Sequence, residues 1–156
     1  MKSKVEQPLV LVCTFTWIGF VCAISFLEAW LKFRAPGVTL PIGLGIGRLV
    51  FAALNKVEWA FAIAILISNL KNWKNDKPNL LFALVVLTLL LQTIWLLPAL
   101  DHRAERYIKG ENVPASYLHF YYVIIEGLKI TALFIFGVRL FKQEESSDSE
   151  IIFNKL

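Results

Sequence analysis

Four long apolar runs dominate this chain of 156 residues. They lie at about residues 8–33, 42–70, 79–100 and 116–141. Each run is long enough to cross a bilayer as an α-helix, which needs roughly 20 apolar residues. Apolar residues make up 57% of the sequence, whereas soluble domains contain about 45–50%. Because backbone groups inside a bilayer must bond within their own segment, the sequence predicts an all-α integral membrane protein, a four-transmembrane-helix bundle.

A single membrane domain accounts for most of the chain. Residues 1–142 contain the four runs and their short links, which leaves no length for a second soluble domain. The first run continues past the length of a signal peptide, so we expect it to be retained as a span. Residues 143–156 are acidic and rich in serine, and we expect them to form a disordered tail.

The basic residues indicate where the protein resides. The formal net charge is +4, but Lys and Arg gather at the ends of the apolar runs, where membrane proteins carry topological signals. We therefore expect the lipid bilayer as a partner and exclude nucleic acid. The link between the second and third runs carries Lys71, Lys74 and Lys77. These lysines favour a multi-pass protein of the cell membrane with both termini in the cytoplasm.

Two of the runs carry polar residues at one shared spacing. The second residue follows the first by seven positions and the third follows it by ten, in Arg48, Asn55 and Glu58 and again in His119, Glu126 and Lys129. On a helix these offsets fall within about 80° of arc, so each set forms a polar stripe along one face. A full charge near the bilayer centre costs about 2.5–3.5 kcal/mol, so the stripes should face each other, water or a ligand.

The second and fourth spans run in the same direction, so residues equally far from their starts lie at similar depths. We expect these two spans to be neighbours. Glu58 should then pair with Lys129 as an intramembrane ion pair, and Glu126 should lie near Arg48 or Asn55.

The acidic ends of the other two spans reach the same side of the membrane. Glu28 stands near the end of the first span and Asp101 follows the third. We expect this side to hold the only polar cavity of the bundle. The candidate site consists of Glu28, Arg48, Asn55, Glu58, Asp101, His119, Tyr122, Glu126 and Lys129.

Two functions fit such a charge network. Intramembrane Glu, His and Lys residues mark ligand, ion and proton sites, so the network can bind a small polar or amphipathic ligand or a proton. Alternatively, the charges fix helix packing in a structural or accessory subunit, within a homo-oligomer or beside another membrane protein. The sequence leaves both functions open.

An enzyme is the third class to consider. His102 and His119 should reach the same membrane face, but the chain has no HExxH or CxxC motif that would support a metal site. We expect no enzymatic activity, no bound metal and no cofactor.

A family resemblance covers most of the chain. It rests on the segments EAWLKFRAPG, GRLVFAALNKVEW, WLLPALDHRAERYIKGE and SYLHFYYVIIEGLK. These resemble a family of small four-helix bacterial membrane proteins known only as a domain of unknown function. The resemblance implies a four-span membrane protein and supplies neither an activity nor a functional residue.

Overall fold

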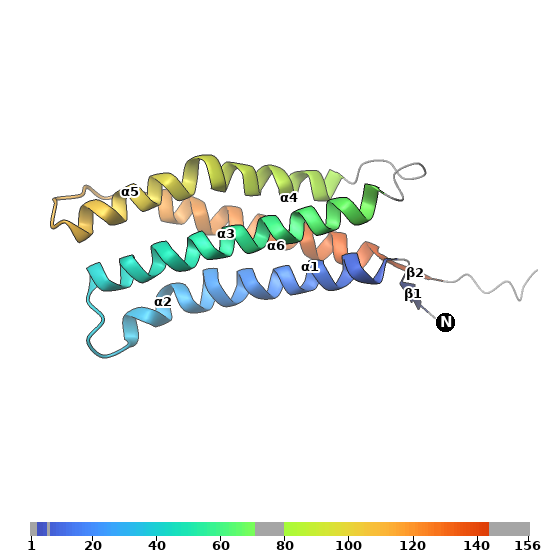
Figure 1. Ribbon diagram of the computed structural model, residues 1–156, viewed down its shortest axis with the longest axis horizontal. Coiled ribbons are helices and arrows are strands. Elements are labelled where there is room, and N and C mark those ends of the chain that lie inside the picture. The colour runs from blue at the N-terminus through green and yellow to red at the C-terminus, as the bar shows by residue number, and fades with distance from the viewer. Residues whose placement is uncertain (1–2, 6, 71–79, 144–156) are drawn as a thin grey trace, which may run out of the picture.

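The computed structural model describes residues 3–5, 7–70 and 80–143, which form an antiparallel bundle of four helical rods (Figure 1). Rod one joins α1 (Pro8–Val21), the π-helical segment η1 (Cys22–Glu28), α2 (Ala29–Leu31) and the 3-10 segment η2 (Lys32–Arg34). Rod two is α3 (Leu40–Leu70). Rod three joins α4 (Leu80–Leu91), the π-helical segment η3 (Gln92–Leu96) and α5 (Leu97–Ile108). Rod four is α6 (Leu118–Arg139).

All four rods are long and apolar enough to cross a membrane, by length and composition. Their bounds lie close to those of the predicted spans, and the helix of rod three continues beyond the predicted span to Ile108, through a segment of helical character that ends before Gly110. Proline at position 98 has no backbone N–H to offer Ile94, and the wider turn of η3 directly before it absorbs this defect without ending the helix. Rod three ends at Ile108, two residues before Gly110, whose φ of 77° suits a glycine helix stop.

A short antiparallel strand pair joins the two ends of the described chain, which the sequence did not predict. Strand β1 (Ser3–Val5) pairs with β2 (Phe141–Gln143), and Val5 stands opposite Phe141. The pair holds the first and last described segments at the same end of the bundle (Figure 1). The predicted disordered tail lies, from residue 144 onward, outside the described residues.

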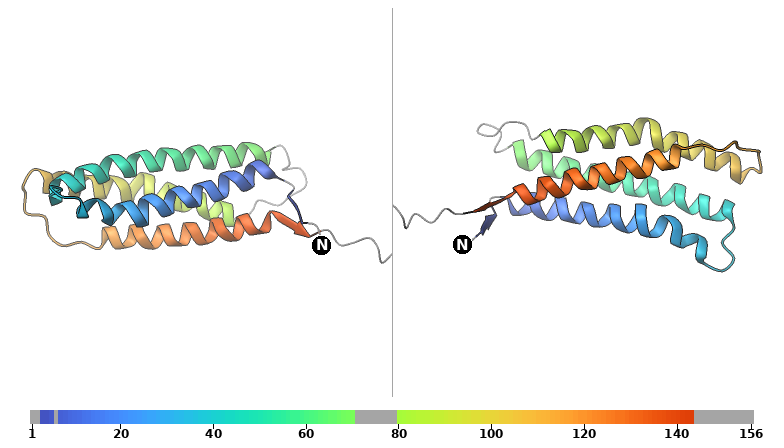
Figure 2. Two further views of the ribbon diagram at one scale, coloured as in Figure 1. Left: turned by 90° about the horizontal axis from the view of Figure 1, so that it is seen from below. Right: turned by 180° about the vertical axis from the view of Figure 1, so that it is seen from behind.

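The order of the rods around the bundle corrects one expectation. Helix α1 packs against both α3 and α6, while α4 packs against α6 and α5 against α3. Helices α3 and α6 therefore lie diagonally across the bundle, as the views in Figure 2 show, and the prediction that they are neighbours is wrong. Short links make consecutive rods antiparallel neighbours, so two rods that run in the same direction take opposite corners.

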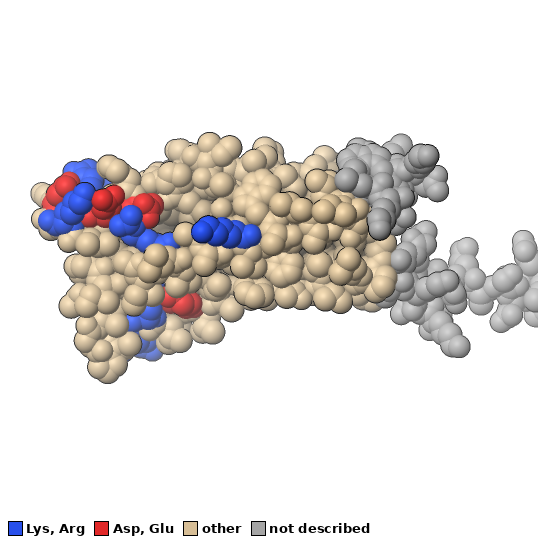
Figure 3. All heavy atoms as spheres, in the orientation of Figure 1, with Lys and Arg blue, Asp and Glu red and all other residues tan. Residues whose placement is uncertain are grey.

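The two ends of the bundle have different interiors. Toward the strand pair the core is apolar and includes Val10, Ile65, Phe82, Leu133 and Phe136. Charged side chains gather instead at the opposite end, over α2 and α5, while the rest of the face in Figure 3 is almost free of them. The polar stripes of α3 and α6 enter the bundle from this charged end.

Candidate functional site

The polar residues form two adjoining structures at different depths. Glu58, Glu126 and Lys129 make a fully enclosed cluster, which we call the buried triad. Their relative exposures are 1%, 0% and 0%. Between the triad and the end of the bundle lies a cavity of about 660 Å³, which we call the pocket.

The buried triad is joined by its one ammonium group. Lys129 Nζ donates hydrogen bonds to Glu58 Oε1 and, at 2.7 Å, to Gln92 Oε1. The same nitrogen lies 3.0 Å from Glu126 Oε2. Glu58 and Lys129 come from the diagonal helices α3 and α6, so their long side chains meet at the centre although their backbones are not neighbours.

The neighbouring rods complete the surroundings of the triad. Trp17 Nε1 of rod one donates to Glu58 Oε1 at 2.9 Å, and Ser25 Oγ donates to Glu126 Oε1 at 3.3 Å. The Tyr122 hydroxyl lies within hydrogen-bonding reach of Glu126 and Ser25. Two buried atoms at the triad, Gln92 Nε2 and Glu126 Oε2, have no hydrogen-bond partner among the described residues. Every rod therefore contributes a polar group to this cluster.

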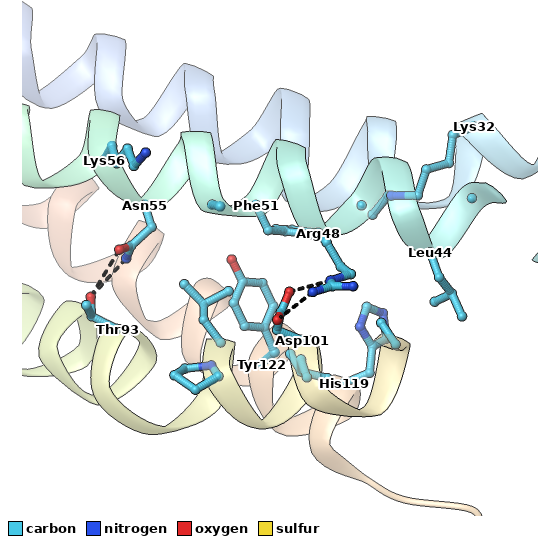
Figure 4. Close-up of a pocket in the computed structure, with 18 of the residues that line it drawn as sticks. Lys32, Leu44, Arg48, Phe51, Asn55, Lys56, Thr93, Asp101, His119 and Tyr122 are labelled. Carbon is cyan, nitrogen blue, oxygen red and sulfur yellow. Dashed lines mark hydrogen bonds and ion pairs between the residues drawn. The ribbon is translucent and has the colours of Figure 1, made fainter. Parts of the chain in front are cut away.

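The pocket lies between the end of rod one, α3, α5 and the start of α6 (Figure 4). Most of its lining is apolar, with Phe33, Phe51 and Leu97 among the larger side chains. On α3 the lining extends from Gly43 to Lys56, which corresponds to about 20 Å along the helix axis. The pocket is therefore elongated and lies along α3.

The pocket wall carries two hydrogen-bonded polar pairs (Figure 4). Arg48 binds Asp101 in a bidentate manner, with nitrogen–oxygen distances of 2.6 and 2.9 Å. Deeper in the pocket, Asn55 Nδ2 donates to Thr93 Oγ1 at 2.9 Å, and Trp59 Nε1 donates to the same oxygen at 3.0 Å. The Thr93 hydroxyl therefore ties α3 to rod three.

Two lysines line the pocket, and only one of them has an ion-pair partner among the described residues. Lys32 Nζ lies 3.1 Å from Glu28 Oε2, one turn earlier on rod one. Lys56 also lines the pocket, but within the described residues it forms no ion pair or hydrogen bond. Its charge is the unpaired one on this wall.

The predicted site is thus divided rather than single. The pocket is lined by Arg48, Asn55, Asp101, His119 and Tyr122 of the candidate residues. Glu58, Glu126 and Lys129 lie beneath it in the triad, and Glu28 reaches it only through Lys32. The predicted contact of Glu126 with Arg48 or Asn55 is not formed. Arg48 binds Asp101 and Asn55 binds Thr93 instead.

Four side chains that matter here were outside the predicted site. Gln92 and Thr93 are polar residues in the most apolar run, and that contrast alone could have marked them. Lys56 is a charge within an apolar run, again a visible signal. Trp17 has no such signal, since an indole in an apolar run is ordinary, and only the fold shows that its N–H meets Glu58.

Neither metal chemistry nor a known relative assigns this site. Within residues 3–5, 7–70 and 80–143, no group of three His, Cys, Asp or Glu side chains is placed to hold a metal ion. Compared with models of known protein families, with curated proteins and with solved structures, the chain matches none. The resemblance described above therefore stays a prediction, and function must be argued from the geometry.

Proposed function

We propose that this chain is an integral membrane protein that crosses the membrane four times. The length and composition of its rods support this. So do the large apolar side chains that each rod turns outward, such as Leu9, Leu49, Leu80 and Leu128, which are 61%, 75%, 83% and 56% exposed. Lipid tails would cover this surface, which a soluble monomer would leave in water. We place both termini in the cytoplasm, on the side of the lysine-rich link at 71–77.

We further propose that the pocket binds a small amphipathic ligand with an acidic group. The observation that carries this proposal is the unpaired Lys56 on the wall of a largely apolar cavity of about 660 Å³. That volume falls within the range of about 300–1,000 Å³ that is typical of small-molecule sites. Lys56 is exposed on the surface of α3, and inside a membrane an unpaired ammonium group is costly, so an anion in the pocket would stabilise it.

The other charges of the pocket favour an acid over a base. Arg48 and Lys32 already have carboxylate partners in Asp101 and Glu28, so Lys56 is the cation that remains for the ligand. Beside it, the Asn55 side chain offers an amide. The apolar body of the ligand would lie along α3 against Phe51 and Leu97, and its acidic group would meet Lys56. The proposed role is binding or carriage of this ligand, without catalysis.

Native mass spectrometry of the detergent-purified full chain tests this proposal. Dodecanoate serves as the probe and dodecanol, which has the same carbon chain without the charge, as its control. We expect dodecanoate to bind to the wild type and to Lys56→Arg, and to bind much more weakly to Lys56→Ala. Lys109→Ala, which removes a cation outside the pocket lining, should bind like the wild type. Equal binding of dodecanoate and dodecanol, or no effect of Lys56→Ala, would reject the proposal.

A structural or accessory subunit is the second candidate. The observation in its favour is the buried triad, whose three side chains bond to groups from all four rods and lie outside the pocket lining. Such a network can hold a bundle in one arrangement without binding anything. The same mass spectra would then show a homo-oligomer or a bound partner protein, and the pocket would stay empty with either probe.

A further inference from the structure

The buried triad has unequal numbers of acids and bases. It contains two carboxyl groups, those of Glu58 and Glu126, against the single ammonium group of Lys129. If all three were ionised, a net negative charge would remain in a region where none of these side chains is exposed by more than 2%. An uncompensated charge in such surroundings is strongly unfavourable, so the cluster needs one more positive charge.

Among the described residues, the elements packed against the triad supply no second cation. The groups that face the triad are neutral donors or acceptors from α1, η1, η3 and α6, namely Trp17, Ser25, Gln92 and Tyr122. Arg48, the next cation along the α3 stripe, is paired with Asp101 at the pocket. Glu126 Oε2 lies 3.0 Å from Lys129 Nζ but has no hydrogen-bond partner among the described residues, so one oxygen of this carboxyl group is left to carry a proton.

We propose that the buried triad is a proton-binding site, in which Glu58 and Glu126 share one bound proton and Lys129 stays charged. With one carboxyl group neutral, the other carboxylate balances the ammonium group and the cluster carries no net charge. Glu58 accepts hydrogen bonds from both Lys129 and Trp17, and Glu126 is the acid of the pair that lies next to Tyr122. The inference depends on the triad alone and not on the ligand proposed for the pocket.

Tyr122 gives this site a route to the pocket. Its side chain lines the pocket, and its hydroxyl lies within hydrogen-bonding reach of Glu126. On release, the proton of Glu126 passes to the Tyr122 oxygen, while the hydroxyl's own proton passes to a water or anion in the pocket. The hydroxyl is thereby restored, Glu126 is left as a carboxylate, and one proton has moved outward.

Infrared spectroscopy of the full chain at neutral pH tests the proposal by counting protonated acids. A neutral carboxylic acid has a carbonyl band separate from that of a carboxylate, and this band shifts in deuterated water. We expect one equivalent of this band in the wild type. Glu58→Gln and Glu126→Gln should each abolish it, since one acid then balances Lys129. Lys129→Met should raise it to two equivalents, and Asp101→Asn, at the exposed pocket pair, should leave it at one.

Several results would overturn the proposal. These are a wild type without the band, a band that survives in either Gln variant, and a Lys129→Met protein that folds but still shows one equivalent. A bound monovalent cation in place of the proton would produce the first of these. If Lys129→Met does not fold, the two Gln variants decide, because each leaves a balanced pair. In Tyr122→Phe we expect the band to persist and its exchange with deuterated water to slow by at least about ten-fold; unchanged exchange would refute the route through Tyr122.

Discussion

Arg48 at the pocket and Glu58 in the buried triad belong to the same polar stripe of α3, but their charges have different kinds of partner. The side chains of Arg48 and Asp101 at the pocket are 31% and 48% exposed, whereas those of the triad are at most 2% exposed. Arg48 precedes Glu58 by ten residues on α3, or about 15 Å along the axis. Depth along the rod therefore decides whether a charge is open to a ligand or must be satisfied by the protein itself.

This contrast predicts where substitutions are costly. A fully enclosed ion pair is strongly destabilising when one partner is lost, because the other charge stays buried alone. A pair at the surface contributes little, since water replaces the lost partner. We therefore expect substitutions in the triad to lower the free energy of unfolding, and substitutions at the pocket to change the affinity for the ligand.

The largest effect is expected for Lys129→Met, which removes the only cation of the triad. The loss of unfolding free energy should be about 3–5 kcal/mol, as for other broken buried pairs, because the carboxylate that balanced Lys129 must then also take up a proton or stay charged without a partner. Unfolding in detergent, followed by circular dichroism, measures it. Lys56→Met is the matched control, since it deletes a lysine of α3 that has no ion pair within the described residues. Equal stability of the two variants would show that the triad is no more costly to break than the pocket wall.

A smaller loss is expected when the triad keeps its charges but loses a neutral donor. Trp17→Phe removes the N–H that Glu58 accepts at 2.9 Å while keeping an aromatic ring. Leaving a buried acceptor short of a partner costs about 1–3 kcal/mol. The control is Trp30→Phe, because Trp30 is 50% exposed. If both variants unfold at the same denaturant concentration, the hydrogen bond to Glu58 contributes nothing to stability.

An intermediate site joins the two regions, and its removal should have an intermediate effect. Thr93→Val deletes the hydroxyl that accepts hydrogen bonds from Asn55 and Trp59. We expect a loss of about 1 kcal/mol, typical of a partly buried hydrogen bond. Thr131→Val is the control, because the Thr131 hydroxyl is exposed and bonds only to its own helix, at Gly127. A larger loss for Thr131→Val would contradict the role of Thr93 as the link between α3 and rod three.

The same contrast explains what the sequence could and could not predict. Run length is a local property, and it was enough to place all four rods within a few residues apart from the end of rod three. The shared spacing placed Glu58 and Lys129 at the same depth, where they now meet. Which rods are neighbours depends on long-range packing, so the diagonal placement of α3 and α6 could not be obtained from periodicity.

The sequence also could not predict which residues the side chains of the stripes would bind. Spacing gives the depth of a side chain but not the direction from which a third rod approaches. Asp101 was expected in the same cavity as Arg48, yet nothing in the sequence indicated that it would bind that arginine directly. Likewise the division of the candidate residues between pocket and triad depends on where the rods separate, which is a property of the packed bundle.

The smallest effect on stability is expected at the pocket, and it should come with the clearest change in binding. Asp101→Asn removes the carboxylate that occupies both nitrogens of Arg48. Because the pair is exposed, the unfolding midpoint should stay at the wild-type value. The freed guanidinium group then adds a second unpaired cation to the pocket, so the affinity for dodecanoate should rise by about ten-fold. Dodecanol, which carries no charge, should bind as before.

Glu105→Gln is the matched control, since Glu105 pairs with Lys109 outside the pocket lining. An Asp101→Asn protein that loses stability like Lys129→Met, or that binds dodecanoate no better than the control does, would show that the pocket charges serve packing just as the triad does.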